Sequence, residues 1–286
     1  MAWANQGQAR HFVQALVVGA GLLAGVAQAE VRGQVVEYTQ GGQVFEGYLA
    51  WDDAVQGKRP GVLVVQTWTG VGDFIRKRAE MVAAMGYVAF APDVYGKGIR
   101  PKPPRETGAE MAKYTGNRPL LRERMTAGFE VLRANPMADV SRLAAIGFCF
   151  GGTGVLELAR TGADLRGVVS FHGGPLSSPT PDDGRNIKGS VLILHGADDP
   201  NVPAADIAAV QKELREAKTD WQFVAYANAV HSFTDPAAGN DNSRGAAYNA
   251  IADRRSWIAM QDFFREIGIV RGFPAVDSNI AQRESQ

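Results

Sequence analysis

The sequence predicts an α/β fold in which a mostly parallel central sheet of about eight strands is covered by helices on both faces. Short, continuous apolar runs, such as Gly61–Gln66 and Val191–Leu194, have the length and composition of strands buried on both faces. Longer segments with apolar residues at helical spacing, such as Asp73–Met85, alternate with these runs along the chain. Strands that alternate with helices in this way are typical of parallel sheets.

The elements can be expected in chain order. Residues 31–51 alternate apolar and polar side chains around Gly41-Gly42, which predicts an opening antiparallel hairpin. Pro92 ends a strand at 87–91, and the basic, Pro- and Gly-rich stretch that follows is expected to be a loop at the edge of the sheet where ligands bind. The remaining expected elements are strands at 140–146, 167–171 and 221–227, helices at 117–133, 153–160, 205–217 and 246–266, and a loop beside a pocket at 173–183.

The N-terminal segment has the layout of a secretory signal peptide. Arg10 and His11 precede an apolar stretch at 12–27, and Ala27-Gln28-Ala29 matches an A-x-A cleavage site. An uncleaved N-terminal anchor is the alternative. We therefore expect a secreted or periplasmic protein with no membrane association after cleavage, organised as a signal peptide (1–29), one α/β domain (30–270) and a C-terminal tail (271–286).

Charge and cysteine content narrow the function classes. The chain has 30 basic and 30 acidic side chains, and this balance argues against nucleic acid as a partner, for which a basic excess is expected. Cys149 is the only cysteine. Exported proteins normally pair their cysteines or avoid them, so a single retained thiol favours a reactive role.

The surroundings of Cys149 predict a nucleophile. Gly147-Phe148-Cys149-Phe150-Gly151-Gly152 lies between an expected strand and an expected helix. A strand, Gly-x-nucleophile-x-Gly and a helix, in this order, resemble the nucleophile elbow of α/β-hydrolases, here with a thiol in place of the usual serine. The turn would place the sulfur at a helix N-terminus, which favours a thiolate. A small buried cysteine in a Gly-rich turn is the alternative.

A thiol nucleophile needs a base and a group that orients the base. His172, His195 and His231 each follow an expected strand, but only His231 comes after every plausible acid, as the hydrolase order of nucleophile, acid and histidine requires. His172 and His195 are interpreted as strand-end residues that hydrogen-bond nearby backbone. Of the adjacent acids Asp198 and Asp199, the pattern H-G-x-x-D-x-x-V-P selects Asp199.

Four motifs together resemble the dienelactone hydrolase family over nearly the whole chain after the signal peptide. They are the cysteine elbow, Pro92-Asp93-Val94-Tyr95-Gly96, His195-Gly196-Ala197-Asp198-Asp199-Pro200-Asn201-Val202-Pro203 and His231-Ser232-Phe233. The resemblance implies an α/β-hydrolase fold with no metal and no cofactor. It also implies Cys149 as nucleophile, His231 as base, Asp199 as orienting acid, and an oxyanion hole made of the backbone N–H groups of Phe150 and Trp68.

The sequence departs from the family archetype at two positions. Thr67 replaces a glutamate that helps to form the thiolate, and Asp235 replaces an arginine that grips a substrate carboxylate. Dienelactone is therefore not expected to be the natural substrate. Arg254 and Arg255, or the loop with Arg100 and Arg105, are alternative sources of positive charge, although solvated surface positions are the simpler interpretation. We expect Thr67, Tyr95, His172 and Asp235 to line the substrate pocket.

These observations predict a hydrolase of small carboxylic esters or lactones that works through an acyl-thioester intermediate. The expected partner is therefore a small-molecule ester or lactone. A non-catalytic small-molecule binding protein on the same scaffold and a thiol redox protein are the alternatives, the latter without a resolving cysteine in the chain. Acyl transfer to another acceptor, the acyl group and the oligomeric state stay open.

Overall fold

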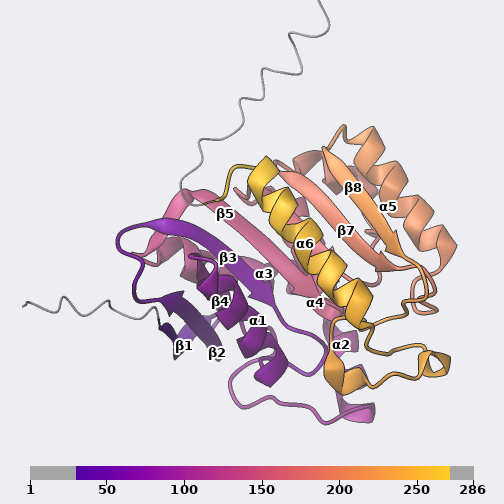
Figure 1. Ribbon diagram of the computed structural model, residues 1–286, viewed down its shortest axis with the longest axis horizontal. Helices are drawn as coiled ribbons and strands as arrows, with labels where there is room; N and C mark the ends of the chain where they lie inside the picture. The colour runs from indigo at the N-terminus through magenta and orange to yellow at the C-terminus, as the bar shows by residue number, and fades with distance from the viewer. Residues whose placement is uncertain (1–29, 271–286) are drawn as a thin grey trace, which may run out of the picture.

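A computed structural model describes residues 30–270, in which eight strands form one sheet with the order β1-β2-β4-β3-β5-β6-β7-β8 (Figure 1). Strand β2 pairs antiparallel with β1 and β4, whereas every pair from β4 to β8 is parallel. The α/β fold with a mostly parallel sheet is therefore confirmed. The predicted signal peptide and C-terminal tail lie outside the described residues.

The strands lie close to the positions that apolar patterning predicts. The hairpin around Gly41-Gly42 is present as β1 and β2, and the buried runs form the central strands. The bounds are β1 Val31–Gln40, β2 Gln43–Asp52, β3 Arg59–Val65, β4 Val88–Ala91, β5 Ala138–Phe148, β6 Gly167–Phe171, β7 Ser190–Gly196 and β8 Trp221–Tyr226.

The helices differ from the expected ranges more than the strands do. The bounds are α1 Asp73–Ala84, α2 Arg105–Thr115, α3 Arg118–Ala134, α4 Phe150–Arg160, α5 Ala204–Glu216 and α6 Ala250–Glu266, with short 3₁₀ helices at Pro181–Asn186, Pro236–Ala238 and Asn242–Arg244. The sequence did not predict α2. Helix α4 begins directly after Cys149, and α6 begins at Ala250 rather than 246, because the Asn249 side chain caps it by accepting from the N–H groups of Ile251 and Ala252.

Helices cover both faces of the sheet (Figure 1). Helices α1 and α6 pack on one face, where Ile75, Val82, Met260 and Phe264 are buried with strand side chains such as Val64. Helices α2 to α5 pack on the other face and bury residues such as Tyr114, Met125, Leu156 and Leu214. The two apolar layers hold the sheet rigid and leave the loops at its C-terminal edge to form a site.

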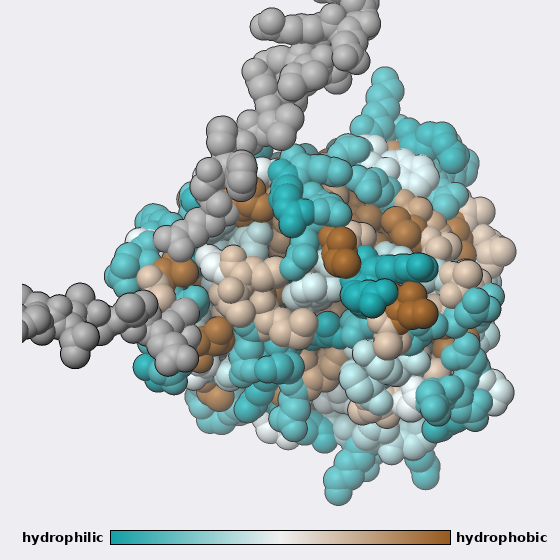
Figure 2. Space-filling model, in the orientation of Figure 1, coloured by the Kyte–Doolittle hydropathy of each residue, from teal (hydrophilic) through white to brown (hydrophobic). Residues whose placement is uncertain are grey.

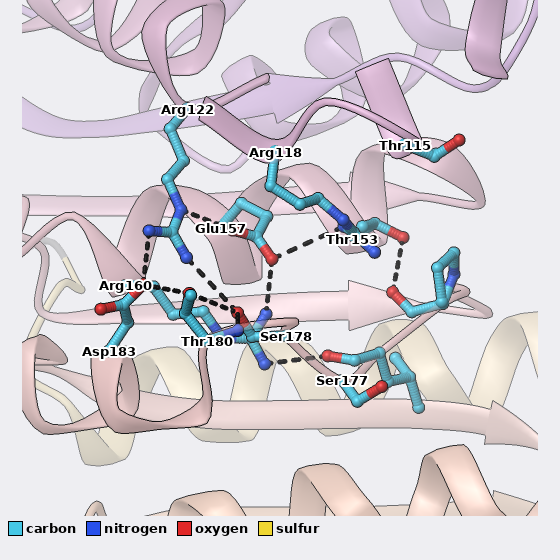
Figure 3. A network of polar contacts seen from close by, with 12 residues as sticks. Thr115, Arg118, Arg122, Thr153, Glu157, Arg160, Ser177, Ser178, Thr180 and Asp183 are labelled. Carbon is cyan, nitrogen blue, oxygen red and sulfur yellow. Dashed lines mark hydrogen bonds and ion pairs between the residues drawn. The ribbon is translucent and has the colours of Figure 1, made fainter. Parts of the chain in front are cut away.

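A buried ionic cluster ties the loop at 173–183 to α4 (Figure 3). The Arg160 guanidinium, 1% exposed, donates to Glu213 at 2.7 Å, to Glu157 at 3.0 Å and to the Leu176 carbonyl at 2.9 Å. Arg122 bridges Glu157 and Asp183, with 2.6 Å to each. These contacts hold the loop that follows β6 against the helix that follows Cys149.

Replacing Arg160 with methionine should destabilise the protein strongly. The substitution leaves the carboxylates of Glu157 and Glu213 buried with fewer donors, and breaking a buried pair in this way costs about 3–5 kcal/mol. Exposed Arg185 pairs with Asp182 at 3.5 Å in the same region and provides the control, because Arg185→Met should leave stability unchanged. Urea denaturation of both variants measures the difference, and equal midpoints would contradict this account.

The face shown in Figure 2 is mostly polar, with strongly apolar residues in small separate groups. Exposed large apolar side chains in the described part of the chain include Ile251 and Ile258 on α6. Scattered apolar residues of this kind are normal for a protein surface. None of the helices between residues 30 and 270 combines the length and apolar character that crossing a bilayer requires.

Candidate active site

The predicted site residues follow parallel strands at one edge of the sheet. Trp68 follows β3, Cys149 follows β5, Asp199 follows β7 and His231 lies in the loop after β8. Because the carboxyl ends of parallel strands meet at the same edge, residues far apart in the sequence come together there.

Cys149 lies in a sharp turn between β5 and α4, with φ 56° and ψ −117°. The flanking glycines are required for steric reasons. A Cβ on Gly147 would lie 2.0 Å from the Gly151 carbonyl oxygen, and a Cβ on Gly151 would lie 2.4 Å from the Val65 carbonyl oxygen. Both clashes involve backbone, which cannot move aside as a side chain can, so the turn admits only glycine at these positions.

Gly147→Ala should therefore destabilise the protein by about 1–3 kcal/mol or more, because the added methyl group must displace backbone. Gly108→Ala is the matched control. Gly108 lies in α2, and a Cβ added there would have nothing within 4 Å, so alanine should stabilise by roughly 0.5–1 kcal/mol. Thermal melts of the two variants measure the effects. A Gly147→Ala melt at the wild-type temperature would show that the turn tolerates a side chain.

The structure brings Cys149, His231 and Asp199 into one hydrogen-bonded line. His231 Nε2 lies 3.0 Å from the Cys149 sulfur, and His231 Nδ1 lies 2.8 Å from Asp199 Oδ2. The other Asp199 oxygen accepts from the Asn201 N–H at 2.8 Å, which fixes the carboxylate. Asp198 is exposed, so the geometry assigns the carboxylate facing His231 to Asp199.

The Cys149–His231 pair favours a thiolate and an imidazolium. Burial raises the pKa of the Cys149 thiol, but the His231 charge, its hydrogen bond and the N–H groups of Phe150 and Trp68 outweigh burial, so the net shift is downward. Burial lowers the pKa of His231, but the thiolate and the Asp199 hydrogen bond raise it to about 10. Between these two pKa values the pair is charged and the sulfur is a ready nucleophile.

The backbone N–H groups of Phe150 and Trp68 both lower the pKa of the Cys149 thiol, which places two donors beside the sulfur. The Tyr95 hydroxyl donates to the Trp68 carbonyl at 3.0 Å and holds this loop in position. The Tyr95 ring also lies 5.8 Å from the Phe150 ring. Through these contacts Tyr95 supports the two residues that carry the backbone donors, Trp68 and Phe150.

Asp93 is a supporting residue that sequence analysis did not identify. Its side chain is fully buried and accepts from the N–H groups of Glu46, Tyr95 and Gly96 at 3.1–3.2 Å. Asp93 thereby fixes the loop that carries Tyr95. Its position in the motif Pro92-Asp93-Val94-Tyr95-Gly96 was the available signal, but a structural role cannot be distinguished from a catalytic one in a motif alone.

Thr67, Asp235 and His172 were also predicted to line the pocket, and each has its own hydrogen-bond partner in the structure. The buried Thr67 hydroxyl shares a 2.9 Å hydrogen bond with the Thr69 hydroxyl, and Asp235 accepts from the Ala237 N–H at the start of a 3₁₀ helix. His172 is 1% exposed, and its Nδ1 accepts from the Cys149 N–H at 3.1 Å. The expectation that His172 and His195 hydrogen-bond backbone is met for His172, with a partner from another loop, whereas Nδ1 of His195 has no hydrogen-bond partner.

The arginines considered as replacements for the family's substrate-binding arginine are paired with acidic groups or exposed. Arg100 lies 3.5 Å from Asp93 and 3.6 Å from Glu46. Arg254 and Arg255 are exposed on α6, as expected for solvated positions. Within residues 30–270, no group of three or more His, Cys, Asp or Glu side chains has an arrangement that could hold a metal ion.

Comparison with known proteins places the chain in a family. Residues 45–268 match the model of the Dienelactone hydrolase family. A putative carboxymethylenebutenolidase of Synechocystis sp. is 28% identical over 233 residues, which cover 77% of this chain and 90% of the relative. A solved dienelactone hydrolase-like promiscuous phosphotriesterase from metagenomic libraries is 42% identical with a TM-score of 0.79, covering 83% of this chain and 98% of its own. A putative dienelactone hydrolase from Klebsiella pneumoniae, 22% identical with a TM-score of 0.70, covers 82% of this chain and 98% of its own and shares the fold. The protein is thus a member of the dienelactone hydrolase family.

Proposed function

We propose that the protein hydrolyses small carboxylic esters or lactones, with Cys149 as nucleophile, His231 as base and Asp199 as the acid that orients His231. The observation that carries the proposal is the line of hydrogen bonds from sulfur to carboxylate, at 3.0 Å and 2.8 Å. Each contact lies within the reach that proton transfer between nucleophile and base requires.

Acylation begins with the thiolate. The Cys149 sulfur attacks the carbonyl carbon, and the carbonyl oxygen becomes an oxyanion that the N–H groups of Phe150 and Trp68 stabilise. His231 enters this step as an imidazolium and gives its Nε2 proton to the leaving oxygen. The C–O bond breaks, the alcohol departs, and a thioester on Cys149 remains. For a lactone, the released hydroxyl stays attached to the acyl group.

Deacylation uses the same residues with the proton moving the other way. Once the sulfur is acylated, its negative charge no longer raises the pKa of His231, so the imidazole becomes a base that takes a proton from water. Hydroxide attacks the thioester, and the thiolate leaves. Asp199 keeps the Nδ1–H tautomer, so that Nε2 faces the water and the sulfur.

The neighbouring residues support a small, uncharged substrate. Tyr95 and Phe150 are buried aromatic side chains beside the sulfur, and Trp68 is half-buried. Thr67 is neutral, so activation of the thiol depends on His231 and the adjacent N–H groups rather than on a second carboxylate. Two features therefore support an uncharged substrate: aromatic side chains surround the sulfur, and the thiolate forms without a second carboxylate.

The test is turnover of p-nitrophenyl acetate, p-nitrophenyl butyrate and simple γ- and δ-lactones, combined with rapid-quench mass spectrometry of the intact protein. We expect release of p-nitrophenol and an acyl adduct that maps to Cys149. Binding of these esters without turnover would support the non-catalytic alternative. A silent panel with a thiol that peroxide oxidises reversibly would support the redox alternative, and either result would overturn the proposal.

A phosphotriester is the second candidate substrate class. The 42% identity to a promiscuous phosphotriesterase over 83% of this chain favours it, because a thiolate with two N–H donors can attack phosphorus as well as a carbonyl carbon. We expect slow release of p-nitrophenol from diethyl p-nitrophenyl phosphate. A wild-type rate indistinguishable from that of a Cys149→Ala variant would remove this candidate.

We also propose that the protein is exported and that its leader is cleaved after Ala29. The basic start, the apolar stretch at 12–27 and the A-x-A site support this. N-terminal sequencing of the protein from the cell envelope or medium should begin at Glu30. Full-length chain retained in the membrane fraction would support the uncleaved anchor instead.

A further inference from the structure

The nucleophile and its base belong to loops that are 82 residues apart in the sequence, and a buried histidine lies between these loops. His172 follows β6, the strand next to β5 in the sheet. Its ring packs edge-to-face on the His231 ring, with centroids 5.4 Å apart, and on the Phe233 ring at 5.0 Å. The ring therefore faces the catalytic histidine from below the site, where solvent does not reach.

Both ring nitrogens of His172 have partners, one in each loop. Nδ1 accepts from the Cys149 N–H at 3.1 Å, and that same N–H also points to the Phe171 carbonyl at 3.0 Å. Since Nδ1 accepts, the ring proton lies on Nε2, which donates to the Thr234 hydroxyl at 2.8 Å. One neutral ring thus connects the backbone of the nucleophile to a residue three positions after His231.

The two residues that His172 connects, Cys149 and Thr234, are each held in place by further contacts. Cys149 and His172 both have positive φ, 56° and 39°, a conformation that persists only where surrounding contacts hold it. Thr234 is fully buried, and its carbonyl accepts from Arg78 at 2.6 Å. The Arg78 guanidinium lies 5.5 Å from the centre of the Phe148 ring and pairs with Asp253 of α6 at 2.8 Å, so it joins the same two loops from the α1 side.

The surroundings keep the His172 ring neutral. Burial lowers its pKa well below the usual value, and the nearby charges of His231 and Arg78 lower it further. Cys149 of the elbow and Asp253 of α6 are further titratable groups near this connection, and Tyr248 and Asp235 lie beside Asp253. A neutral ring retains Nδ1 as an acceptor, which a doubly protonated ring would lose.

We propose that His172 is a positioning residue, which sets the separation of the Cys149 sulfur and His231 by joining the Cys149 backbone to Thr234. This inference rests on the proposed function, because it concerns the same nucleophile and base. The side-chain hydrogen bonds of His172 go to the Cys149 backbone and to Thr234 rather than to the sulfur or the His231 ring nitrogens, so it acts through the two loops that it connects. A displacement of about 1 Å between nucleophile and base can cost on the order of 100-fold in rate.

Thr234→Val tests the connection with the smallest change of shape, since a methyl group replaces the hydroxyl that accepts from Nε2. We expect kcat for p-nitrophenyl acetate to fall by about 10-fold with KM within about 2-fold, because the sulfur–imidazole geometry changes while the pocket does not. Thr234→Ser retains the hydroxyl and should recover most of kcat. His172→Phe, which removes both hydrogen bonds but fills the space, should lower kcat by about 100-fold.

A second readout does not depend on turnover. The rate of Cys149 alkylation by iodoacetamide across pH reports the thiolate, and its midpoint should move upward in Thr234→Val and in His172→Phe as the imidazolium loses its alignment with the sulfur. His195→Asn is the matched control. His195 is also a buried strand-end histidine, but its Nδ1 has no hydrogen-bond partner, so kcat and the alkylation midpoint should stay at wild-type values.

The outcomes separate the possible roles. Folded Thr234→Val and His172→Phe proteins with wild-type kcat and alkylation midpoint, even if they melt earlier, would overturn the proposal in favour of a purely structural histidine. A shifted midpoint in a protein whose wild type hydrolyses no ester would leave the positioning role intact and overturn the proposed function alone. If His172→Phe does not fold, the comparison of Thr234→Val with Thr234→Ser decides the question.

Discussion

Cys149→Ala should reduce ester turnover by a factor on the order of 10⁴–10⁶, because in the proposed mechanism Cys149 alone forms the acyl intermediate. The remaining rate would come from the two backbone donors and from substrate binding. Burst and steady-state release of p-nitrophenol measure the loss, and the acyl adduct seen by mass spectrometry should disappear with it.

Cys149→Ser is the matched variant for the nucleophile. A hydroxyl fits the same turn, but it ionises far less readily than a thiol, so His231 would have to remove its proton during attack rather than start from an ion pair. We expect activity well below wild type but above Cys149→Ala. If Cys149→Ala turned esters over at the wild-type rate, the nucleophile would have to lie elsewhere.

His231→Ala should lower kcat by about 10³–10⁴-fold or more, since both acylation and deacylation need its proton transfer in the proposed mechanism. The same substitution should also change how alkylation of Cys149 depends on pH. In the wild type, His231 contributes to a Cys149 pKa below the usual value, so the thiol should be alkylated at a lower pH than an ordinary cysteine. Without His231, burial raises the pKa of the thiol, so alkylation at about pH 7 should slow and recover only as the pH rises.

His231→Gln provides the control for shape, because it keeps a polar side chain of similar length without a base. It should show the same loss of turnover and the same alkaline shift in alkylation. Near-wild-type turnover in either variant, or an unchanged alkylation profile, would be incompatible with the ion pair between His231 and Cys149.

Local sequence patterns were sufficient for much of the fold. The hairpin around Gly41-Gly42 and the strand–turn–helix at Cys149 depend on alternation and on glycines, which act within a few residues. Helix α2 was missed because Arg105–Thr115 is polar, contains Gly108 and buries little beyond Thr107, Glu110 and Tyr114. A weak apolar stripe of this kind is a helix only because the rest of the fold covers Tyr114.

The start of α6 shows how tertiary contacts override a periodic pattern. The sequence favoured a helix from Ala246, but the backbone there pairs with the His231 loop, where the Ala247 N–H donates to the His231 carbonyl at 3.0 Å. The segment is therefore extended until Asn249 caps the helix. The pairing partner lies in a separate loop, so no local pattern indicated it.

The sequence alone determined the class of fold, the elbow and the order Cys149, Asp199, His231, because strand length, turn geometry and motif order are properties of short stretches of chain. The tertiary structure decided how closely the Asp199 carboxylate approaches His231, that Asp93 supports Tyr95, and that His172 joins the Cys149 backbone to Thr234. Separations between loops, burial and pKa values arise from packing among distant segments. A residue's chemistry in this site is therefore a property of its neighbours in space as much as of its type.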